Sequence, residues 1–278
     1  SSIFAPSILA AQDTGGTIIE LEDIVVFGGL LPTDLNTTGA TIDVAESDDI
    51  QRGGVGATAA LDALPGASVS ANGGLGGSAT VRIRGLSGPY VGVRLDGIDI
   101  ADPSGPQTAF NFGRLTTGSL DRMAVVKGTQ SAVYGSEAIA GVVEIESWRP
   151  EVSGISGKAN VELGSFETRA ANLSFGYLDD RAELAVSIGR VTSAGFPARD
   201  TDDENDGFEQ NTINLFAAYQ VSDAIRLGIT GLWSDGTAEY DQSATDPLGE
   251  IDETRRGLRA FGEVQVGAWT HELSFGRY

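Results

Sequence analysis

Hydrophobic and polar residues alternate along most of this chain, and the alternation changes in character about half-way. In the first half the apolar runs are short and glycine turns separate them, as in VRIRG at 81–85. Alternation puts Val81 and Ile83 on one face of a strand. The pair Asp96-Gly97 lies between two apolar runs and is a strong hairpin signal. The pattern predicts a small β domain hinged by glycines.

Two further segments of the first half carry local signals. Residues 40–50 predict another strand, and residues 55–64 predict a short helix. That helix would place Val55, Ala59 and Leu64 on one side. We therefore expect some helix in this domain beside its strands.

Glycine-rich segments predict two loop tips. Residues 72–80, NGGLGGSAT, resemble a dinucleotide-binding loop, but a strand follows them and not a helix. No helix N-terminus is then available to bind a pyrophosphate, and a hairpin tip is the better interpretation. Residues 101–110, ADPSGPQTAF, predict a second tip.

The second half of the chain consists of amphipathic segments. Short turns alternate with two long acidic loops, 192–209 and 235–253. Transmembrane β-strands need only about 9–11 alternating residues, and short turns at one end with long loops at the other are typical of outer-membrane barrels. The predicted strands are 158–165, 168–177, 181–190, 211–220, 224–233, 255–267 and 269–278.

Composition narrows the possible partners. The chain has 39 acidic and 18 basic residues, and its formal net charge is −21. A negative charge of this size disfavours nucleic acid as a partner and favours the binding of cations. Cysteine is absent, which excludes disulfides and thiolate metal sites within these residues. No run of about 18 apolar residues predicts a transmembrane helix.

The most acidic stretch is residues 198–210, ARDTDDENDGFEQ. Six carboxylates lie between Asp200 and Glu209. Hard oxygen ligands at this density suit Ca²⁺, which takes 6–8 oxygens. A strict EF-hand is excluded, because Ile213 occupies the position of the bidentate glutamate. A solvated acidic loop without metal is the alternative.

Signatures of enzymes are absent from the sequence. His271 is the only histidine and forms no HExxH pair, and no G-x-S-x-G elbow occurs. Paired carboxylates say little in so acidic a chain. We predict that the protein is not an enzyme and has no catalytic cofactor.

Three motifs in order resemble the plug domain of TonB-dependent outer-membrane transporters: VRIRG, V-x-V-x-LDG and RM-x-VVKG-x-QSAVYGSEAIAGVVEI. The resemblance implies a mainly β protein, in which a small α+β plug precedes the first antiparallel strands of a transmembrane β-barrel. About seven of a presumed total of about 22 strands would be present. It also implies a monomer in the outer membrane of a Gram-negative cell, in contact with lipid.

The expected domains follow from this resemblance and from the change in pattern. Residues 1–11 are apolar and rich in small residues, as in the remnant of a signal peptide. Residues 12–38 form a periplasmic segment, residues 39–150 the plug, and residues 151–278 the start of the barrel.

Residues 22–28 consist of two acidic residues, Glu22 and Asp23, and the short β-branched run that follows them. An extended segment of this kind can add as an edge strand to a partner sheet, although an ordinary first strand is the alternative. The resemblance implies a TonB box, which pairs with TonB of the inner-membrane ExbB/ExbD complex. The predicted TonB-binding residues are Glu22, Asp23, Ile24, Val25 and Val26.

The resemblance also implies that substrate binds at the two glycine-rich tips of the plug. The candidate residues are Gly77, Ser78, Ala79, Thr80, Asp102, Pro103, Ser104 and Gln107.

The run N-D-G-F, then Y-D, then D-x-x-R resembles the BtuB-type cobalamin transporters of this family, whose barrel loops bind calcium. A glutamate at 204 replaces the aspartate of that pattern. The earlier aspartate of the pattern falls near Pro197 in this sequence, so one ligand is missing there, and Asp200, Asp202 and Asp203 are the candidates to substitute for it. The predicted calcium ligands are Asp202, Glu204, Asp206, Asp241 and Asp252.

Together these features imply active transport of a scarce nutrient across the outer membrane, driven through TonB by the proton motive force. Cobalamin or another corrinoid is the favoured substrate. A ferric-siderophore receptor of the same family is the alternative. A soluble calcium-dependent β-protein, acting as a binding module or adhesin, is the alternative from another class.

Overall fold

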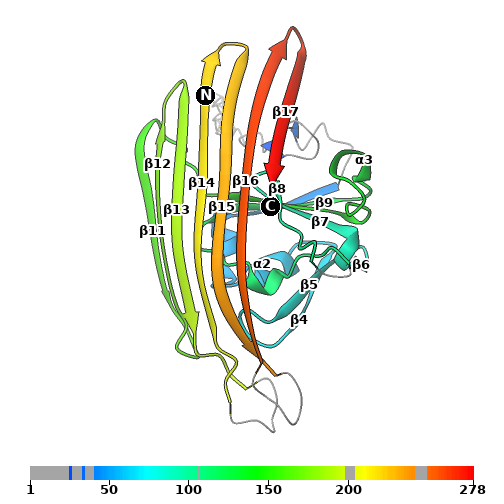
Figure 1. Ribbon diagram of the computed structural model, residues 1–278, viewed down its shortest axis with the longest axis vertical. Coiled ribbons are helices and arrows are strands. Elements are labelled where there is room, and N and C mark those ends of the chain that lie inside the picture. Colours follow the sequence, from blue (N-terminus) through cyan, green and yellow to red (C-terminus); the bar gives the residue numbers. More distant parts are fainter. Residues whose placement is uncertain (1–24, 27–32, 35–40, 105–106, 198–203, 242–248) are drawn as a thin grey trace, which may run out of the picture.

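A plug domain lies against one face of a tall antiparallel sheet (Figure 1). The structure is a computed structural model that describes residues 25–26, 33–34, 41–104, 107–197, 204–241 and 249–278. The mainly β fold predicted from the sequence, a plug followed by antiparallel strands, is confirmed.

The centre of the plug is a five-stranded mixed sheet in the order β3-β9-β10-β7-β8. β10 runs parallel to β7, and the other neighbours are antiparallel. The five strands are β3 (Thr41–Glu46), β9 (Leu120–Lys127), β10 (Gly141–Ser147), β7 (Val91–Leu95) and β8 (Ile98–Asp99).

A second, three-stranded sheet of the plug reaches toward one end of the molecule (Figure 1). It consists of β4 (Ala67–Asn72), β5 (Ser78–Ile83) and β6 (Leu86–Ser87). Short helical segments connect the strands of the two sheets. They are α1 (Ser47–Arg52), α2 (Thr58–Asp62), η1 (Gly88–Tyr90), η2 (Phe112–Arg114) and α3 (Ser131–Tyr134).

Both predicted hairpin signals form turns. Asp96 and Gly97 have φ of 49° and 77°, the left-handed values that a two-residue turn between β7 and β8 requires. The glycine-rich tip connects β4 to β5, where Asn72 pairs with Ser78. The interpretation of residues 72–80 as a hairpin tip is confirmed.

Two local predictions in the plug are wrong in extent. The strand expected over 40–50 ends at Glu46, because Ser47–Arg52 is helical, with acidic residues in its first turn and Arg52 in its last. The helix expected over 55–64 covers only Thr58–Asp62. The buried residues of the helix are Ala60 and Leu61. Of the predicted set, Val55 and Leu64 are buried just outside the helix, whereas Ala59 is exposed.

The main core lies between the plug sheets and these helices. Ile50 of α1 and Leu61 of α2 are fully buried against Ile83, Met123 and Val125 of the strands. Burying a side chain of this size contributes about 1.5–3 kcal/mol. The alternation in VRIRG therefore has the predicted outcome, with its apolar face in the core.

The second half of the chain is one seven-stranded sheet in sequence order, antiparallel throughout. Several strands are longer than predicted, because they continue into the acidic segments; β16 has 18 residues. The strands are β11 (Gly154–Leu163), β12 (Arg169–Leu178), β13 (Ala182–Ser193), β14 (Phe208–Ser222), β15 (Ile225–Tyr240), β16 (Gly249–Val266) and β17 (Trp269–Arg277).

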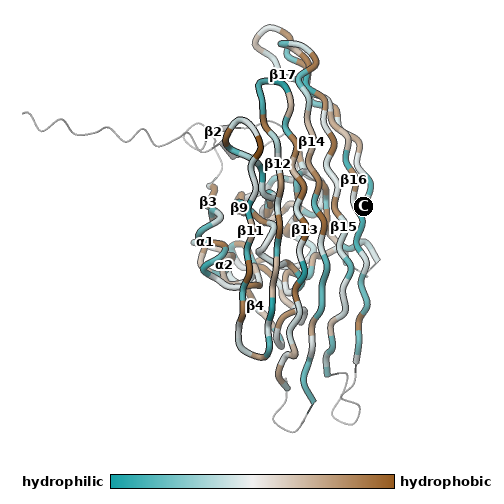
Figure 2. The backbone as a smooth tube through the Cα atoms, turned by 90° about the vertical axis from the view of Figure 1, so that its left-hand side faces the viewer, coloured by the Kyte–Doolittle hydropathy of each residue, from teal (hydrophilic) through white to brown (hydrophobic). Residues whose placement is uncertain are grey.

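The two faces of this sheet differ in polarity. On the outer face Leu173 and Phe175 are 61% and 51% exposed. On the inner face Asn172, Ser174 and Ser187 are buried under the plug. The alternation is visible along the strands in Figure 2, where the ends near the long loops are mostly hydrophilic. Within the described residues, no helix is long and apolar enough to cross a membrane.

The tip of the β4–β5 hairpin packs closely against the seven-stranded sheet β11–β17, which we call the wall. Substitutions of two glycines in the tip test this packing. Gly76 and Gly73 both have φ of +81°, but a Cβ on Gly76 would overlap the Phe208 ring, whereas Gly73 has open space. We expect Gly73→Ala to cost about 1 kcal/mol of stability, from backbone strain alone. Gly76→Ala should cost about 1–3 kcal/mol more. Calorimetric unfolding in detergent measures both, and equal losses would contradict the packing argument.

Candidate functional site

A cavity of about 640 Å³ lies between the tip of the β4–β5 hairpin and the ends of β14–β16. On the plug side, its lining includes Asn72, the four glycines of 73–77 with Leu75 among them, and Ser78. On the wall side it includes Ala238 and Ile251. A cavity of this size matches small-molecule sites, which are mostly about 300–1,000 Å³.

The hairpin tip is fixed from behind by the turn before η2. The Asn111 side chain accepts hydrogen bonds from Ala79 N at 2.9 Å and from Gly113 N at 3.1 Å. Gly76 N donates to Gly113 O at 3.0 Å. Gly113 has no room for a side chain, because its Cβ would overlap the Gly77 carbonyl. The tip is therefore a shaped surface and not a free loop.

Carboxylates dominate the polar lining of the cavity. Asp206 and Asp241 stand at the ends of the two acidic loops, and Glu239 accepts a hydrogen bond from Gly207 N at 2.8 Å. Among the described lining residues, Arg114 is the one cation. The cavity thus favours neutral or cationic ligands, or ligands bound through a divalent cation.

The structure separates the predicted substrate residues into two groups. Gly77 and Ser78 line the cavity, whereas Ala79 is buried at 2% exposure and faces the plug core. Thr80 is half-buried on β5 and lies outside the lining.

The second predicted tip does not reach this cavity. Asp102 bridges to Ala109 and accepts a hydrogen bond from Ser104 N at 2.8 Å. Hydrogen bonds from Ser104 lower the pKa of the Asp102 carboxyl. Pro103, Ser104 and Gln107 are exposed. Substrate binding by this tip stays a prediction.

The predicted calcium ligands are also divided. Asp206 and Asp241 line the cavity together, and Glu204 is close in sequence to Asp206. Asp252 alternates with the cavity-lining Ile251 and accepts a hydrogen bond from Thr237 at 2.6 Å on the other face of the sheet. Asp202 lies outside the described residues. Within the described chain, no three acidic or histidine side chains are close enough to hold a metal ion.

Little of the predicted TonB box is described. Val25 and Val26 form β1 (Val25–Val26), which pairs antiparallel with β2 (Thr33–Asp34). Glu22, Asp23 and Ile24 lie outside the described residues, as does the predicted signal-peptide remnant at 1–11.

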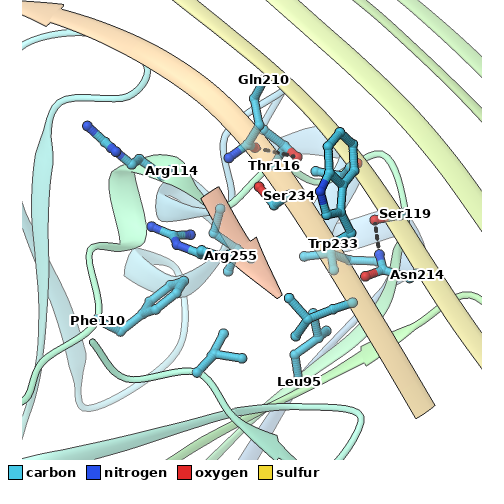
Figure 3. Close-up of a pocket in the computed structure, with 15 residues that line it drawn as sticks. Leu95, Phe110, Arg114, Thr116, Ser119, Gln210, Asn214, Trp233, Ser234 and Arg255 are labelled. Carbon is cyan, nitrogen blue, oxygen red and sulfur yellow. Dashed lines mark hydrogen bonds between the residues drawn. The ribbon is translucent and has the colours of Figure 1, made fainter. Parts of the chain in front are cut away.

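In a neighbouring pocket, which shares Arg114 with the cavity, uncharged polar side chains connect the plug to the wall (Figure 3). Thr116 donates to Gln210 at 3.4 Å, and Asn214 donates to Ser119 at 2.8 Å. These four residues come from the plug segment before β9 and from the inner face of β14. Neutral hydrogen bonds fix the position of the plug without burying unpaired charges.

A charged cluster occupies the other side of the plug. Glu144 of β10 is buried, pairs in register with Arg94 of β7, and is hydrogen-bonded to Tyr134. Burial raises the pKa of Glu144 to about 7, although Arg94 opposes the shift. Arg259 of the wall contributes a weaker opposing effect.

Comparison with known proteins identifies the family. The TonB-dependent Receptor Plug Domain family matches residues 34–142. Residues 34–142 therefore form the plug domain of a TonB-dependent receptor. The predicted location in the outer membrane of a Gram-negative cell is confirmed, and members of the family are not enzymes. An outer-membrane receptor differs in class from the soluble calcium-dependent module, and the comparisons support the receptor.

Curated relatives are similar over much of the receptor chain. The vitamin B12 transporter BtuB of Vibrio vulnificus is 33% identical over 65% of this chain and 30% of its own length. BtuB of Vibrio cholerae is 25% identical over 91% of this chain and 42% of its own length. The chain therefore spans less than half the length of these relatives.

Solved structures share the fold at low identity. The ferripyoverdine receptor of the outer membrane of Pseudomonas aeruginosa has a TM-score of 0.67 at 14% identity, covering 90% of this chain and 35% of that one. The ferric yersiniabactin uptake receptor FyuA of Yersinia pestis has a TM-score of 0.65 at 16% identity, with coverage of 85% and 40%. These similarities support the fold and do not select a substrate.

Sequence reasoning missed several residues around the cavity of the receptor. Asn111 carries a detectable signal, since an asparagine before Phe-Gly-Arg is typical of a capped turn. Arg114 and Glu239 carry no such signal, because only the folded chain places them beside the hairpin.

The raised pKa of Glu144 predicts a pH dependence of stability. A glutamate has an ordinary pKa of 4.5, and the folded receptor holds the proton up to about pH 7. The stabilisation is therefore full below pH 4.5 and is lost as the pH rises through 7, by an amount on the order of 3 kcal/mol. Glu144→Gln should flatten the profile of unfolding free energy against pH, while Glu151→Gln, at an exposed site, should not. Parallel profiles for wild type and Glu144→Gln would contradict the assignment.

Proposed function

We propose that this receptor imports a corrinoid across the outer membrane. Curated relatives at 25–33% identity are vitamin B12 transporters. The observation that carries the proposal is the lining of the cavity, where three carboxylates and one ion-paired arginine face the ligand. A neutral, amide-rich ligand such as cobalamin suits this lining better than an anionic ferric chelate does.

The proposed cycle uses the parts of the chain as follows. The ligand binds between the β4–β5 tip and the wall, and binding shifts the plug. Residues 22–26 then become available to TonB, which adds a strand through backbone hydrogen bonds. The ExbB/ExbD complex supplies force from the proton motive force. In this proposal the receptor is a monomeric barrel in contact with the lipid of the outer membrane.

Calcium is proposed as a structural ion at the acidic ends of the wall. Asp206, which is only 8% exposed, and Asp241 supply hard oxygen donors at one cavity. Two aspartates supply fewer than the 6–8 oxygens that calcium takes. We propose Glu204 and Asp202 as the further ligands. The ion would order the loops around the ligand and would neutralise local charge.

A ferric-siderophore receptor is the second candidate function. The solved structures with this fold include receptors for ferripyoverdine and ferric yersiniabactin. Such a ligand would have to overcome the acidic lining, or bind through cations.

The first test is calorimetric titration of the full-length receptor in detergent with cyanocobalamin, with calcium and then with chelator. We expect tight binding that weakens at least tenfold without calcium, which corresponds to about 1.4 kcal/mol. No binding in either condition would overturn the corrinoid proposal. A ferric pyoverdine titrated in parallel tests the second candidate.

The calcium proposal has its own variant. Asp206→Asn combined with Asp241→Asn should abolish the difference between calcium and chelator, because both oxygen donors lose their charge. Asp223→Asn, in an exposed turn at the opposite end of the wall, is the matched control. A calcium effect that persists in the double variant would show that the ion binds elsewhere.

A further inference from the structure

Arg114 occupies an unusual position between the ligand-facing hairpin and the wall. It is the last residue of η2 and is only 6% exposed. Arg114 lines the cavity, and it also lines the narrow neighbouring pocket, where it lies near Phe110 and Arg255 (Figure 3). A buried cation must be paired, so its partners show what it holds in place.

On the plug side, Arg114 binds the tip of the hairpin. Its Nε donates to the Gly76 carbonyl at 3.3 Å. Gly76 is the residue whose Cα packs closely against Phe208 and Ala238 of the wall. The arginine therefore contacts the tip at the place where plug and wall meet.

On the wall side, Arg114 forms an ion pair with Glu253 of β16, and Glu253 also pairs with Arg255. Arg255 lies over the Phe110 ring of the plug, 5.0 Å from its centroid. Arg114 and Glu253 are 139 residues apart in the sequence. One side chain thus connects the Gly76 carbonyl to the strand that follows the second acidic loop.

We propose that Arg114 is a positioning residue that anchors the β4–β5 tip to β16 and forms the cavity before ligand arrives. The anchor consists of the Gly76 carbonyl, the guanidinium and the Glu253 carboxylate. A ligand then meets a tip that is already ordered, and does not have to order it on binding. The role in ligand affinity rests on the proposed function, whereas the role in ordering the tip does not.

The ligand-free test measures the mobility of the tip directly. A nitroxide is attached at Ala71→Cys, an exposed position on the cavity side of β4, in a full-length receptor from which any other cysteine has been removed. Arg114→Gln should sharpen the electron paramagnetic resonance spectrum of this label. Glu253→Gln should do so to a smaller extent, since a neutral amide still accepts a hydrogen bond. The combined variant should match Arg114→Gln, because both residues act in one anchor.

Arg122→Gln is the matched control. Arg122 forms an ion pair with Glu146 at 2.8 Å within the plug and does not line the cavity. Its loss should leave the label unchanged. An unchanged spectrum in Arg114→Gln, or an equal change in Arg122→Gln, would overturn the anchor. If Arg114→Gln does not assemble, Glu253→Gln and Arg114→Lys, which keeps the charge, carry the same test.

The second readout is cyanocobalamin affinity of the unlabelled receptor. Arg114→Gln should weaken it at least tenfold, and Arg114→Lys should weaken it less. Affinity within twofold of wild type, together with a mobile tip, would overturn the role in pre-forming the site. If the wild-type receptor binds no cyanocobalamin, the corrinoid proposal fails, and the label at position 71 still decides whether Arg114 anchors the tip.

Discussion

Backbone hydrogen bonding in the wall is the constraint on which the rest of the structure depends. In hydrocarbon each unpaired N–H or C=O costs several kcal/mol, so a strand must pair along its whole length. The register from β11 to β17 is accordingly continuous, with irregularities only near a turn. Once strands pair in this way, side chains alternate strictly between lipid and interior. The interior face that results is the surface on which the plug must fit.

That inner surface holds the plug by two kinds of contact. Across β12–β14 the partners are amides and hydroxyls, such as Asn214 with Ser119 and Gln210 with Thr116. On β16 they are charged, as in the ion pair of Glu253 with Arg114 of the plug. The neutral side contributes many weak bonds that exchange readily with water. The charged side fixes orientation, since a displaced buried charge is costly.

Much of the fold could be predicted from the sequence, because its signals are local. Asp96-Gly97 specifies its own turn, and alternation in VRIRG places Val81 and Ile83 in the core. The extension of the long strands could not be predicted in the same way. Residues such as those of Gly249–Val266 are polar on both faces near the loop, so no apolar period marks the strand.

Less of the candidate site than of the fold could be predicted from the sequence. The hairpin tip and two loop aspartates, Asp206 and Asp241, could be predicted, and the structure brings them to one cavity. The pair Arg114–Glu253 could not, because it exists only after plug and wall dock. Alternation likewise turns Asp252 away from the cavity, although its place in the sequence suggests otherwise.

The unequal lengths of the strands have a consequence for the acidic loops. β11 has 10 residues and β16 has 18. Tilted as in other barrels, a strand of that length rises roughly 45 Å, against an apolar band of about 25 Å. β16 therefore exceeds the band by roughly 20 Å, more than a Debye length of about 8 Å, whereas β11 is about as long as the band is tall. The carboxylates at the start of β16, such as Glu250 and Asp252, thus belong to the part of the wall that is longer than the band, and the length of the strand separates them from anionic head groups.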